Sequence, residues 1–178
     1  LELVDFGGGF AVPNPPLERF SQAYGRFAAK HSVSVVLEPG RFLVADAGTL
    51  LTRVLHVKES ERRHIVVDGG MADLLRPALY GAEHPIRLVG GNGIPLERLP
   101  TDVDGPLCEN ADRLGQDVEL PAVKPGDLLA VGRAGAYGFA MASNYVSSLR
   151  PAEVAVEAGE IRLVRRREQP ADLWRLEV

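Results

Sequence analysis

A strand–helix–strand pattern in the first 37 residues most constrains what this chain can fold into. Leu1–Val4 is a short apolar run typical of a buried strand, and Val33–Leu37 is a second one. Between them, after Pro15 and Pro16, apolar residues recur at helical spacing: Leu17, Phe20, Tyr24, Phe27 and Ala28. Two strands joined by a helix across about 35 residues predict a βαβ unit with parallel strands.

Glycine loops follow both predicted strands. The first strand runs into Gly7, Gly8 and Gly9 within L-V-D-F-G-G-G-F, and the second stops at Pro39-Gly40. Because the carboxyl ends of parallel strands meet at one edge of a sheet, we expect both loops at that edge. This is the edge at which α/β proteins bind their ligands.

Beyond about residue 45 the pattern changes to short strands separated by turn signals. The predicted strands are Leu50–Val57, His64–Val67, Ile86–Val89 and Leu128–Val131, followed by a hairpin with arms Glu153–Val156 and Glu160–Val164. Only Ala72–Tyr80 looks helical here, and Pro77 limits its length to about a turn on either side. The sequence therefore predicts the end of an α/β domain, residues 1–44, and a mostly β domain, residues 45–178.

Composition excludes several classes of protein. The 178 residues are 46% hydrophobic, enough for a sizeable core, and the net charge of −4 gives no sign of a nucleic-acid partner. Cys108 is the single cysteine, so no internal disulfide forms. No apolar run approaches the length of a membrane span, and we expect a cytoplasmic protein. Since residue 1 is a leucine inside a strand-like run, we also expect a fragment of a longer polypeptide.

The glycine triplet has two interpretations. Consecutive glycines let several backbone N–H groups converge on one concavity that a phosphate can approach closely. A flexible loop without a ligand is about equally common. Neither standard nucleotide fingerprint is matched, because no Lys-Ser/Thr follows and G-x-G-x-x-G is absent.

Three further segments are ambiguous on their own. E-P-G-R, residues 38–41, is either a carboxylate and an anion-binding arginine beside the phosphate loop or a turn with a surface ion pair. In G-P-L-C-E-N, residues 105–110, the thiol is either a catalyst or a small buried hydrophobe. A-G-A-Y-G-F, residues 134–139, brings the backbone close to another segment and presents Tyr137, which ordinarily would pack in a core.

The order and spacing of these segments are far more specific than any one of them. D-F-G-G-G-F, E-P-G-R, V-D-G-G-M-x-D-x-x-R-P-A-L-Y-G, G-P-x-C-E and A-G-A-Y-G closely resemble the C-terminal half of the diaminopimelate decarboxylase family. These enzymes belong to the fold-III pyridoxal phosphate-dependent decarboxylases. The resemblance extends from about Leu3 to about Asp172. It implies the last strands of an alanine racemase-like (β/α)8 barrel, followed by a β-sandwich or β-barrel domain, with the chain returning to the barrel near residues 140–150.

The resemblance also implies a cofactor site for pyridoxal 5'-phosphate. Gly7, Gly8 and Gly9 would wrap the phosphate with backbone N–H groups, and Gly40 and Arg41 would complete that cradle. Glu38 would face the pyridine nitrogen and keep it protonated, so that the ring can withdraw electrons. Tyr137 would lie near the phosphate, at a subunit boundary.

Substrate and partner roles follow from the same resemblance. Arg41, Arg76 and Tyr80 would hold the distal carboxylate of the substrate, which favours meso-diaminopimelate, the precursor of lysine. Cys108 would act as the proton donor in the neighbouring subunit's site, where Glu109 would grip a substrate amine. Tyr137 would also contact substrate, and no metal is implied. Active sites formed between two chains imply a homodimer.

Departures from the family pattern keep other functions open. Ala11, Asn110 and Arg133 stand where the family usually has Gly, Ser and Asp, and Asn110 bears on substrate choice. The lysine that forms the Schiff base would lie in the missing N-terminal half, because Lys30, Lys58 and Lys124 match no such motif. The fragment alone should therefore be inactive. The alternatives are a fold-III decarboxylase for ornithine, arginine or a carrier-bound amino acid, and a non-catalytic homologue that acts as a binding module.

Overall fold

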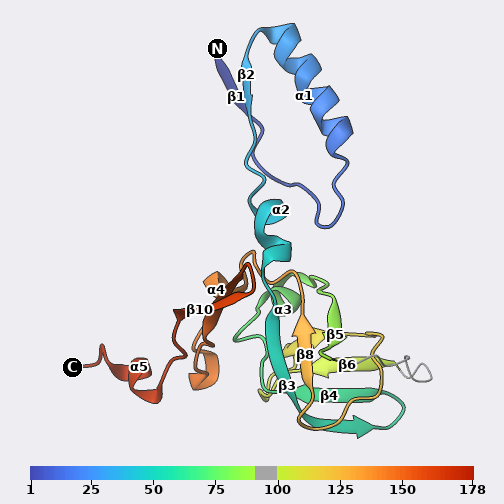
Figure 1. The fold of residues 1–178 in the computed structure, drawn as a ribbon, viewed down its shortest axis with the longest axis vertical. Helices are drawn as coiled ribbons and strands as arrows, with labels where there is room; N and C mark the ends of the chain where they lie inside the picture. Colours follow the sequence, from blue (N-terminus) through green and yellow to red (C-terminus); the bar gives the residue numbers. More distant parts are fainter. Residues whose placement is uncertain (91–99) are drawn as a thin grey trace.

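The first part of the chain is a parallel strand pair with one long helix. In the computed structural model, which describes residues 1–90 and 100–178, strands β1 (Leu3–Asp5) and β2 (Ser34–Val36) pair in parallel, and helix α1 (Leu17–His31) connects them. The predicted βαβ unit is thus confirmed. It extends away from the rest of the chain (Figure 1).

The apolar stripe of α1 packs on the loop that follows β1. The ring of Phe6 lies 4.9 Å from that of Tyr24 and 5.1 Å from that of Phe27, measured between centroids. Phe10 contacts Phe20 edge-on at 5.2 Å. Because these helix residues recur every three or four positions, they form one face, and this face holds the glycine loop against the helix.

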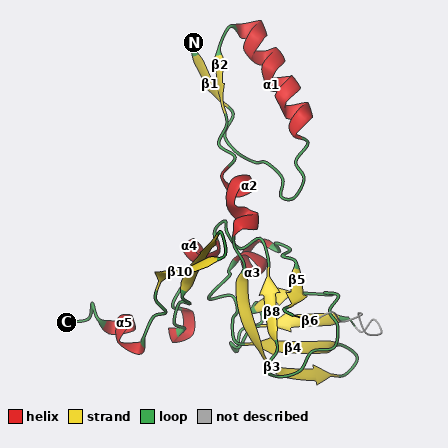
Figure 2. Cartoon of the chain, viewed as in Figure 1, coloured by secondary structure: helices red, strands yellow, loops and turns green. Residues whose placement is uncertain are grey.

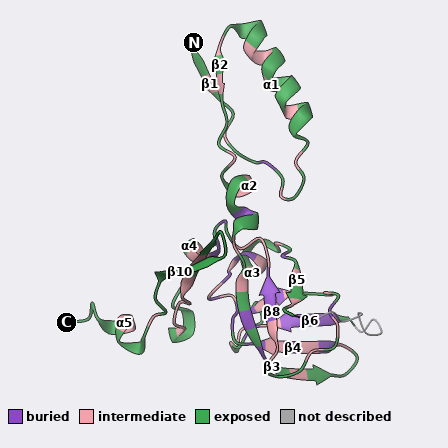
Figure 3. Cartoon of the chain, viewed as in Figure 1, coloured by how far each residue is buried: buried purple, intermediate pink, exposed green. Residues whose placement is uncertain are grey.

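The second part of the chain is a six-stranded sheet in the order β5-β8-β3-β4-β6-β7, in which β4 and β6 pair in parallel and the other neighbouring strands named here pair antiparallel. Its strands are β3 (Leu50–Glu59), β4 (Arg63–Val67), β5 (Ile86–Leu88), β6 (Thr101–Asp104), β7 (Arg113–Gly115) and β8 (Leu128–Val131). The core lies in this sheet, around Val54, Ile65, Val103, Leu114 and Leu129 (Figure 3).

The other helices are short (Figure 2). They are α2 (Gly40–Val44) with the 3-10 turn η1 (Ala45–Ala47), α3 (Arg76–Tyr80), α4 (Gly138–Met141), the 3-10 turn η2 (Tyr145–Ser147) and α5 (Pro170–Trp174). The hairpin of β9 (Glu153–Glu157) and β10 (Glu160–Arg165) forms where the sequence predicts it. No helix in the described ranges is long and apolar enough to cross a membrane.

One predicted element is shorter than expected. The helix expected over Ala72–Tyr80 is only α3, because Met71–Asp73 form a turn and Pro77 lies in the first turn of the helix. Proline is tolerated at that position because the first helical N–H groups have no intrahelical partner. Pro77 therefore lies in the first turn of this helix and does not interrupt it.

Candidate functional site

The site begins where β1 and β2 end together. The N–H of Phe6 donates to the carbonyl oxygen of Val36 at 3.1 Å, and the N–H of Glu38 donates to that of Gly7 at 2.8 Å. The parallel pairing thus continues past the strands and brings the glycine loop beside E-P-G-R, as the sequence predicts.

The three glycines of this loop meet different structural needs. Gly7 and Gly9 have φ values of +67° and +82°, a region that side-chain-bearing residues rarely adopt. Gly8 is constrained by space, because a Cβ atom there would lie 2.6 Å from the carbonyl oxygen of Glu38. The triplet therefore has a conformational and packing reason independent of any phosphate.

Phe10 fixes the two loops to each other. It is buried at 7% exposure and lies between Phe20 of α1 and Phe42 of α2, with centroid distances of 5.2 and 6.1 Å. Because Phe42 directly follows E-P-G-R, this contact ties the end of the glycine loop to the residues after Glu38. The loops thus form one wall.

That wall lines a pocket of about 650 Å³. Its other walls come from α3 and from the segment that leads into α4. The lining residues are Gly8, Gly9, Phe10, Glu38, Pro39, Gly40, Arg41, Phe42, Arg76, Tyr80, Tyr137 and Met141. A Cβ atom at Gly9 or Gly40 would meet no other atom within 4 Å, so the backbone of both residues is open to the pocket.

Arg76 supplies a buried positive charge to this pocket. The residue is only 9% exposed, and its guanidinium carbon lies 5.7 Å from the ring centre of Tyr80 and 5.6 Å from that of Tyr137. Such cation–π contacts orient a guanidinium without neutralising it. Within residues 1–90 and 100–178, no carboxylate forms an ion pair with Arg76. An anion in the pocket would provide the missing counter-charge.

A close approach between the backbone before Tyr137 and the backbone after α2 places Tyr137 at the pocket. The N–H groups of Ala134 and Gly135 donate to the carbonyl oxygens of Gly48 and Ala45 at 2.9 and 3.0 Å. The predicted close approach of this small-residue run is therefore confirmed. Tyr137 itself has a left-handed backbone, φ +63°, and is half exposed, so it does not pack in a core.

Three predicted site residues lie outside this pocket: Gly7, Cys108 and Glu109. Cys108 is exposed, which contradicts a small buried hydrophobe. Glu109 accepts a hydrogen bond from the Tyr145 hydroxyl at 3.2 Å, and this bond raises the pKa of the Tyr145 phenol. The exposed thiol and the half-buried Glu109 are thus consecutive on one loop.

Several residues at the site escaped the sequence analysis. Phe42 and Met141 line the pocket; Phe42 directly follows E-P-G-R, and Met141 lies shortly after A-G-A-Y-G, which is their only sequence signal. Asp112, which holds the loop that carries Cys108, also went unnoticed, because its partners include Met71, 41 residues away.

Comparison with known proteins identifies the family. A family model described as "Pyridoxal-dependent decarboxylase, C-terminal sheet domain" matches residues 21–135. The chain belongs to this decarboxylase family.

Relatives of this decarboxylase chain agree in sequence and in structure. Diaminopimelate decarboxylase of Helicobacter pylori is 41% identical over all of the chain and 45% of its own length, and that of Deinococcus radiodurans is 43% identical over 100% and 46%. The crystal structure of the Helicobacter pylori enzyme complexed with L-lysine superposes with a TM-score of 0.88, covering 99% of this chain and 44% of that one. The chain therefore spans about half the length of these relatives.

The pocket of this decarboxylase chain fits pyridoxal phosphate. Open backbone at Gly9 and Gly40 next to Arg41 suits a phosphate, and the carboxylate of Glu38 suits a basic ring nitrogen. A buried arginine that forms no ion pair within residues 1–90 and 100–178 suits an anionic group of a ligand in the same pocket.

Proposed function

We propose that the full-length protein is a pyridoxal phosphate-dependent decarboxylase that converts meso-diaminopimelate to L-lysine. The observation that carries this proposal is the shared pocket: Glu38, the open glycines and Arg76 line one cavity. The relatives named diaminopimelate decarboxylase support the same reaction.

We propose the following division of the chain. Residues 1–44, with β1 and β2, would be the end of an alanine racemase-like barrel, and residues 45–178 a β-sandwich or β-barrel domain with a return to the barrel near residues 140–150. The parallel pairing of β1 and β2 and the six-stranded sheet support this division.

Cofactor binding is proposed for the edge formed by β1 and β2. The phosphate would lie against the backbone of Gly8, Gly9 and Gly40, near Arg41 and Tyr137, while Gly7, which donates its N–H to Asp5, would shape the loop. Glu38 would hold a proton on the pyridine nitrogen. Bound there, pyridoxal phosphate supplies the electron-withdrawing ring that makes loss of CO₂ feasible.

The part of the pocket lined by Arg76, Tyr80 and Tyr137 is proposed to select the substrate. Arg76, flanked by Tyr80 and Tyr137, would pair with the distal carboxylate, and Arg41 lies on the same cavity wall. A guanidinium offers two parallel N–H donors that match a carboxylate. Lysine and ornithine lack this distal carboxylate, so they would leave Arg76 without a counter-charge.

Cys108 and Glu109 are proposed to serve the other subunit of a homodimer. Both lie outside the pocket of their own chain, and Cys108 is exposed. The thiol would deliver the proton that replaces CO₂, while Glu109 would bind a substrate amine.

The test is the substrate profile of the full-length enzyme and its Arg76→Ala variant. CO₂ release should be fastest from meso-diaminopimelate and should fall about 100-fold or more in the variant, while slow turnover of lysine or ornithine changes little, since the pair lost is a charged hydrogen-bonded one worth several kcal/mol. Arg87→Ala is the matched control, because Arg87 is exposed on β5. An equal loss for all three substrates would contradict the assignment of Arg76.

A further inference from the structure

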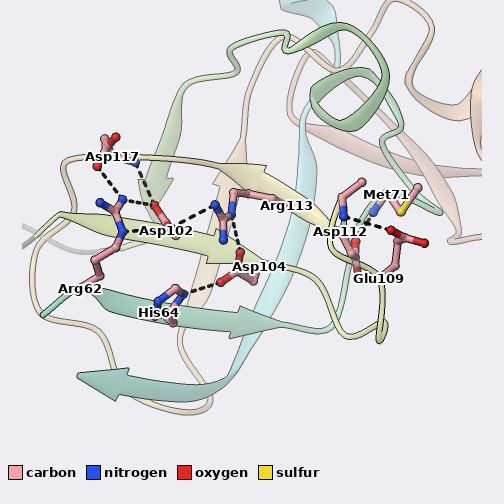
Figure 4. A network of polar contacts seen from close by, with 10 residues as sticks. Arg62, His64, Met71, Asp102, Asp104, Glu109, Asp112, Arg113 and Asp117 are labelled. Atoms are coloured by element: carbon pink, nitrogen blue, oxygen red, sulfur yellow. Dashed lines mark hydrogen bonds and ion pairs between the residues drawn. The ribbon is translucent and has the colours of Figure 1, made fainter. Parts of the chain in front are cut away.

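Asp112 lies beneath the loop that carries Cys108 and Glu109. This loop joins β6 to β7, and Asp112 is 4% exposed. One carboxylate oxygen accepts the N–H of Leu107 at 2.7 Å, and the other accepts the N–H of Met71 at 2.6 Å. In Figure 4, Asp112 lies beside Met71 and Glu109, apart from the larger network of charged residues.

The backbone of Asp112 closes the same loop. Its carbonyl oxygen accepts the N–H of Gly105 at 2.8 Å, and its own N–H donates to the carbonyl oxygen of Glu109 at 3.0 Å. Cys108 therefore lies between two residues, Leu107 and Glu109, whose backbones are both bonded to Asp112. Both chain neighbours of the thiol-bearing residue are thus bonded to Asp112.

Two glycines make room for the Asp112 carboxylate. A Cβ atom at Gly70 or at Gly105 would overlap its oxygen atoms. Gly70 belongs to the turn before α3, which carries Arg76, and Gly105 begins the Cys108 loop. The carboxylate is thus enclosed by both segments and joins them.

No cation accounts for the burial of this carboxylate. Among the residues that the structure describes, Asp112 forms no ion pair with lysine, arginine or histidine. Its carboxylate accepts short, charge-assisted hydrogen bonds from backbone N–H groups. Its contribution is therefore geometric: it holds two backbone segments at a fixed separation.

We propose that Asp112 is a positioning residue for Cys108, through which it acts on the active site of the neighbouring chain. This inference rests on the proposed function, in which Cys108 delivers a proton across the dimer. Asp112 would touch neither substrate nor cofactor.

The first test is Asp112→Asn in the full-length enzyme. The amide keeps the size of the side chain but turns one acceptor into a donor, which would face the N–H of Met71 or of Leu107. A loosened thiol should lower kcat about 10- to 100-fold with little change in KM, since displacement of a reacting group by about 1 Å costs rate on that scale. In a Cys108→Ala background the same change should cost almost nothing further.

Mixed dimers then show on which site Asp112 acts. An Asp112→Asn chain mixed with a chain that lacks the cofactor lysine should recover activity, because one site combines an intact lysine with an intact Cys108 loop. Mixed with a Cys108→Ala chain, it should recover none. The reverse pattern, recovery with Cys108→Ala and none with the lysine-deficient chain, would place Asp112 in its own chain's site and overturn the inference.

Two controls keep the outcome interpretable. If Cys108→Ala alone leaves kcat unchanged, the proposed role of Cys108 fails, and the inference about Asp112 fails with it. If Cys108→Ala is slow while Asp112→Asn turns over normally, only the inference fails. Should Asp112→Asn not fold, Asp112→Glu, which keeps both acceptor oxygens at a longer reach, should give the same mixed-dimer pattern.

Discussion

Gly48 and Gly135 lie backbone against backbone, so that a Cβ atom on either glycine would overlap or crowd the main chain of the other. A Cβ on Gly135 would also overlap the carbonyl oxygen of Val44, the last residue of α2. The crossing therefore fixes the segment after E-P-G-R to the segment that presents Tyr137. It links two walls of the pocket.

Gly135→Ala should disrupt this crossing. Since the collision is with backbone, which cannot move aside as a side chain can, we expect a loss beyond the roughly 1–3 kcal/mol typical of overpacking. Urea unfolding of the full-length enzyme measures it. Gly138→Ala is the control, because its Cβ would make only ordinary contacts of 3.7 Å with Ala134 and Leu74. Equal stability of both variants would contradict the crossing.

Gly40→Ala tests the phosphate site better than any change at Gly8. A side chain at Gly8 would collide with Glu38 whether or not a phosphate binds, whereas Cβ at Gly40 meets open space and alanine suits the start of α2. We expect unchanged stability and at least about tenfold weaker cofactor binding, which is a loss of about 1.4 kcal/mol in binding free energy. Titration of the apoenzyme with pyridoxal phosphate measures it.

Gly25→Ala is the control for Gly40→Ala. Gly25 lies within α1, a Cβ there also meets open space, and the residue does not line the pocket. It should leave cofactor affinity unchanged. A Gly40→Ala enzyme that binds pyridoxal phosphate as tightly as the parent would exclude Gly40 from the phosphate cradle.

Glu38→Gln should cost turnover and spare binding. An amide cannot stabilise a proton on the pyridine nitrogen as a carboxylate does, so we expect kcat to fall about 100-fold or more, as for other electrostatic contacts to the reacting system. The backbone bond from Glu38 to Gly7 is retained, and cofactor affinity should change only a few-fold. Glu83→Gln, an exposed site, is the control. A larger effect on KM than on kcat would contradict this role.

The sequence predicted the candidate pocket better than it predicted the sheet. Parallel strands necessarily bring Gly8 and Glu38 to one edge, so that part of the pocket followed from local patterns. Strand β6 was missed because T-D-V-D carries little apolar signal. Its burial depends on residues far along the chain, since the guanidinium of Arg62 pairs with the carboxylate of Asp102, which is 2% exposed, at 2.6 Å (Figure 4).

Asp102 shows why such a strand is invisible to periodicity. Burial pushes the pKa of this carboxyl up, but hydrogen bonds from Arg62 and from the N–H of Asp117, with the charge of Arg113, outweigh burial and leave the pKa below its ordinary value. Strand β6 is therefore stabilised through contacts to the charged carboxylate of Asp102. Pairings across 40 residues, like that of Asp112 with Met71, cannot be read from one sequence alone.

Val146→Asn should stabilise the protein. Val146 has φ +53° and ψ +37°, a left-handed conformation that costs a side-chain-bearing residue roughly 1–2 kcal/mol and that asparagine tolerates better. Since the residue is 56% exposed, little apolar burial is lost. We expect a gain of about 1 kcal/mol in urea unfolding.

Val154→Asn is the control for Val146→Asn. Val154 is 57% exposed on β9, where its backbone is extended and suits valine. That change should give no gain. If both variants shift the unfolding midpoint alike, the effect comes from surface polarity and not from the backbone of Val146.

Glu168 should make the hairpin junction sensitive to acid. Its carboxylate accepts hydrogen bonds from Nε and from the backbone N–H of Arg150, both at 2.8 Å, and from the side-chain amide of Asn144 at 2.6 Å. Arg150 precedes β9 and Glu168 follows β10, so these bonds close the base of the hairpin. The hydrogen bonds from Arg150 lower the pKa of Glu168 from 4.5 to about 2.

The direction of the pH effect follows from that lowered pKa. The stabilisation is fully present above pH 4.5, the ordinary value, and is lost as the pH falls through about 2, because the unfolded chain binds the proton first. Glu168→Gln should therefore be less stable than the parent at pH 7, and this difference should shrink between pH 4.5 and 2 in urea unfolding. Glu119→Gln, at an exposed site, should show no such convergence. A stability difference for Glu168→Gln that stays constant down to pH 2 would mean that the Arg150–Glu168 contact contributes nothing through its charge.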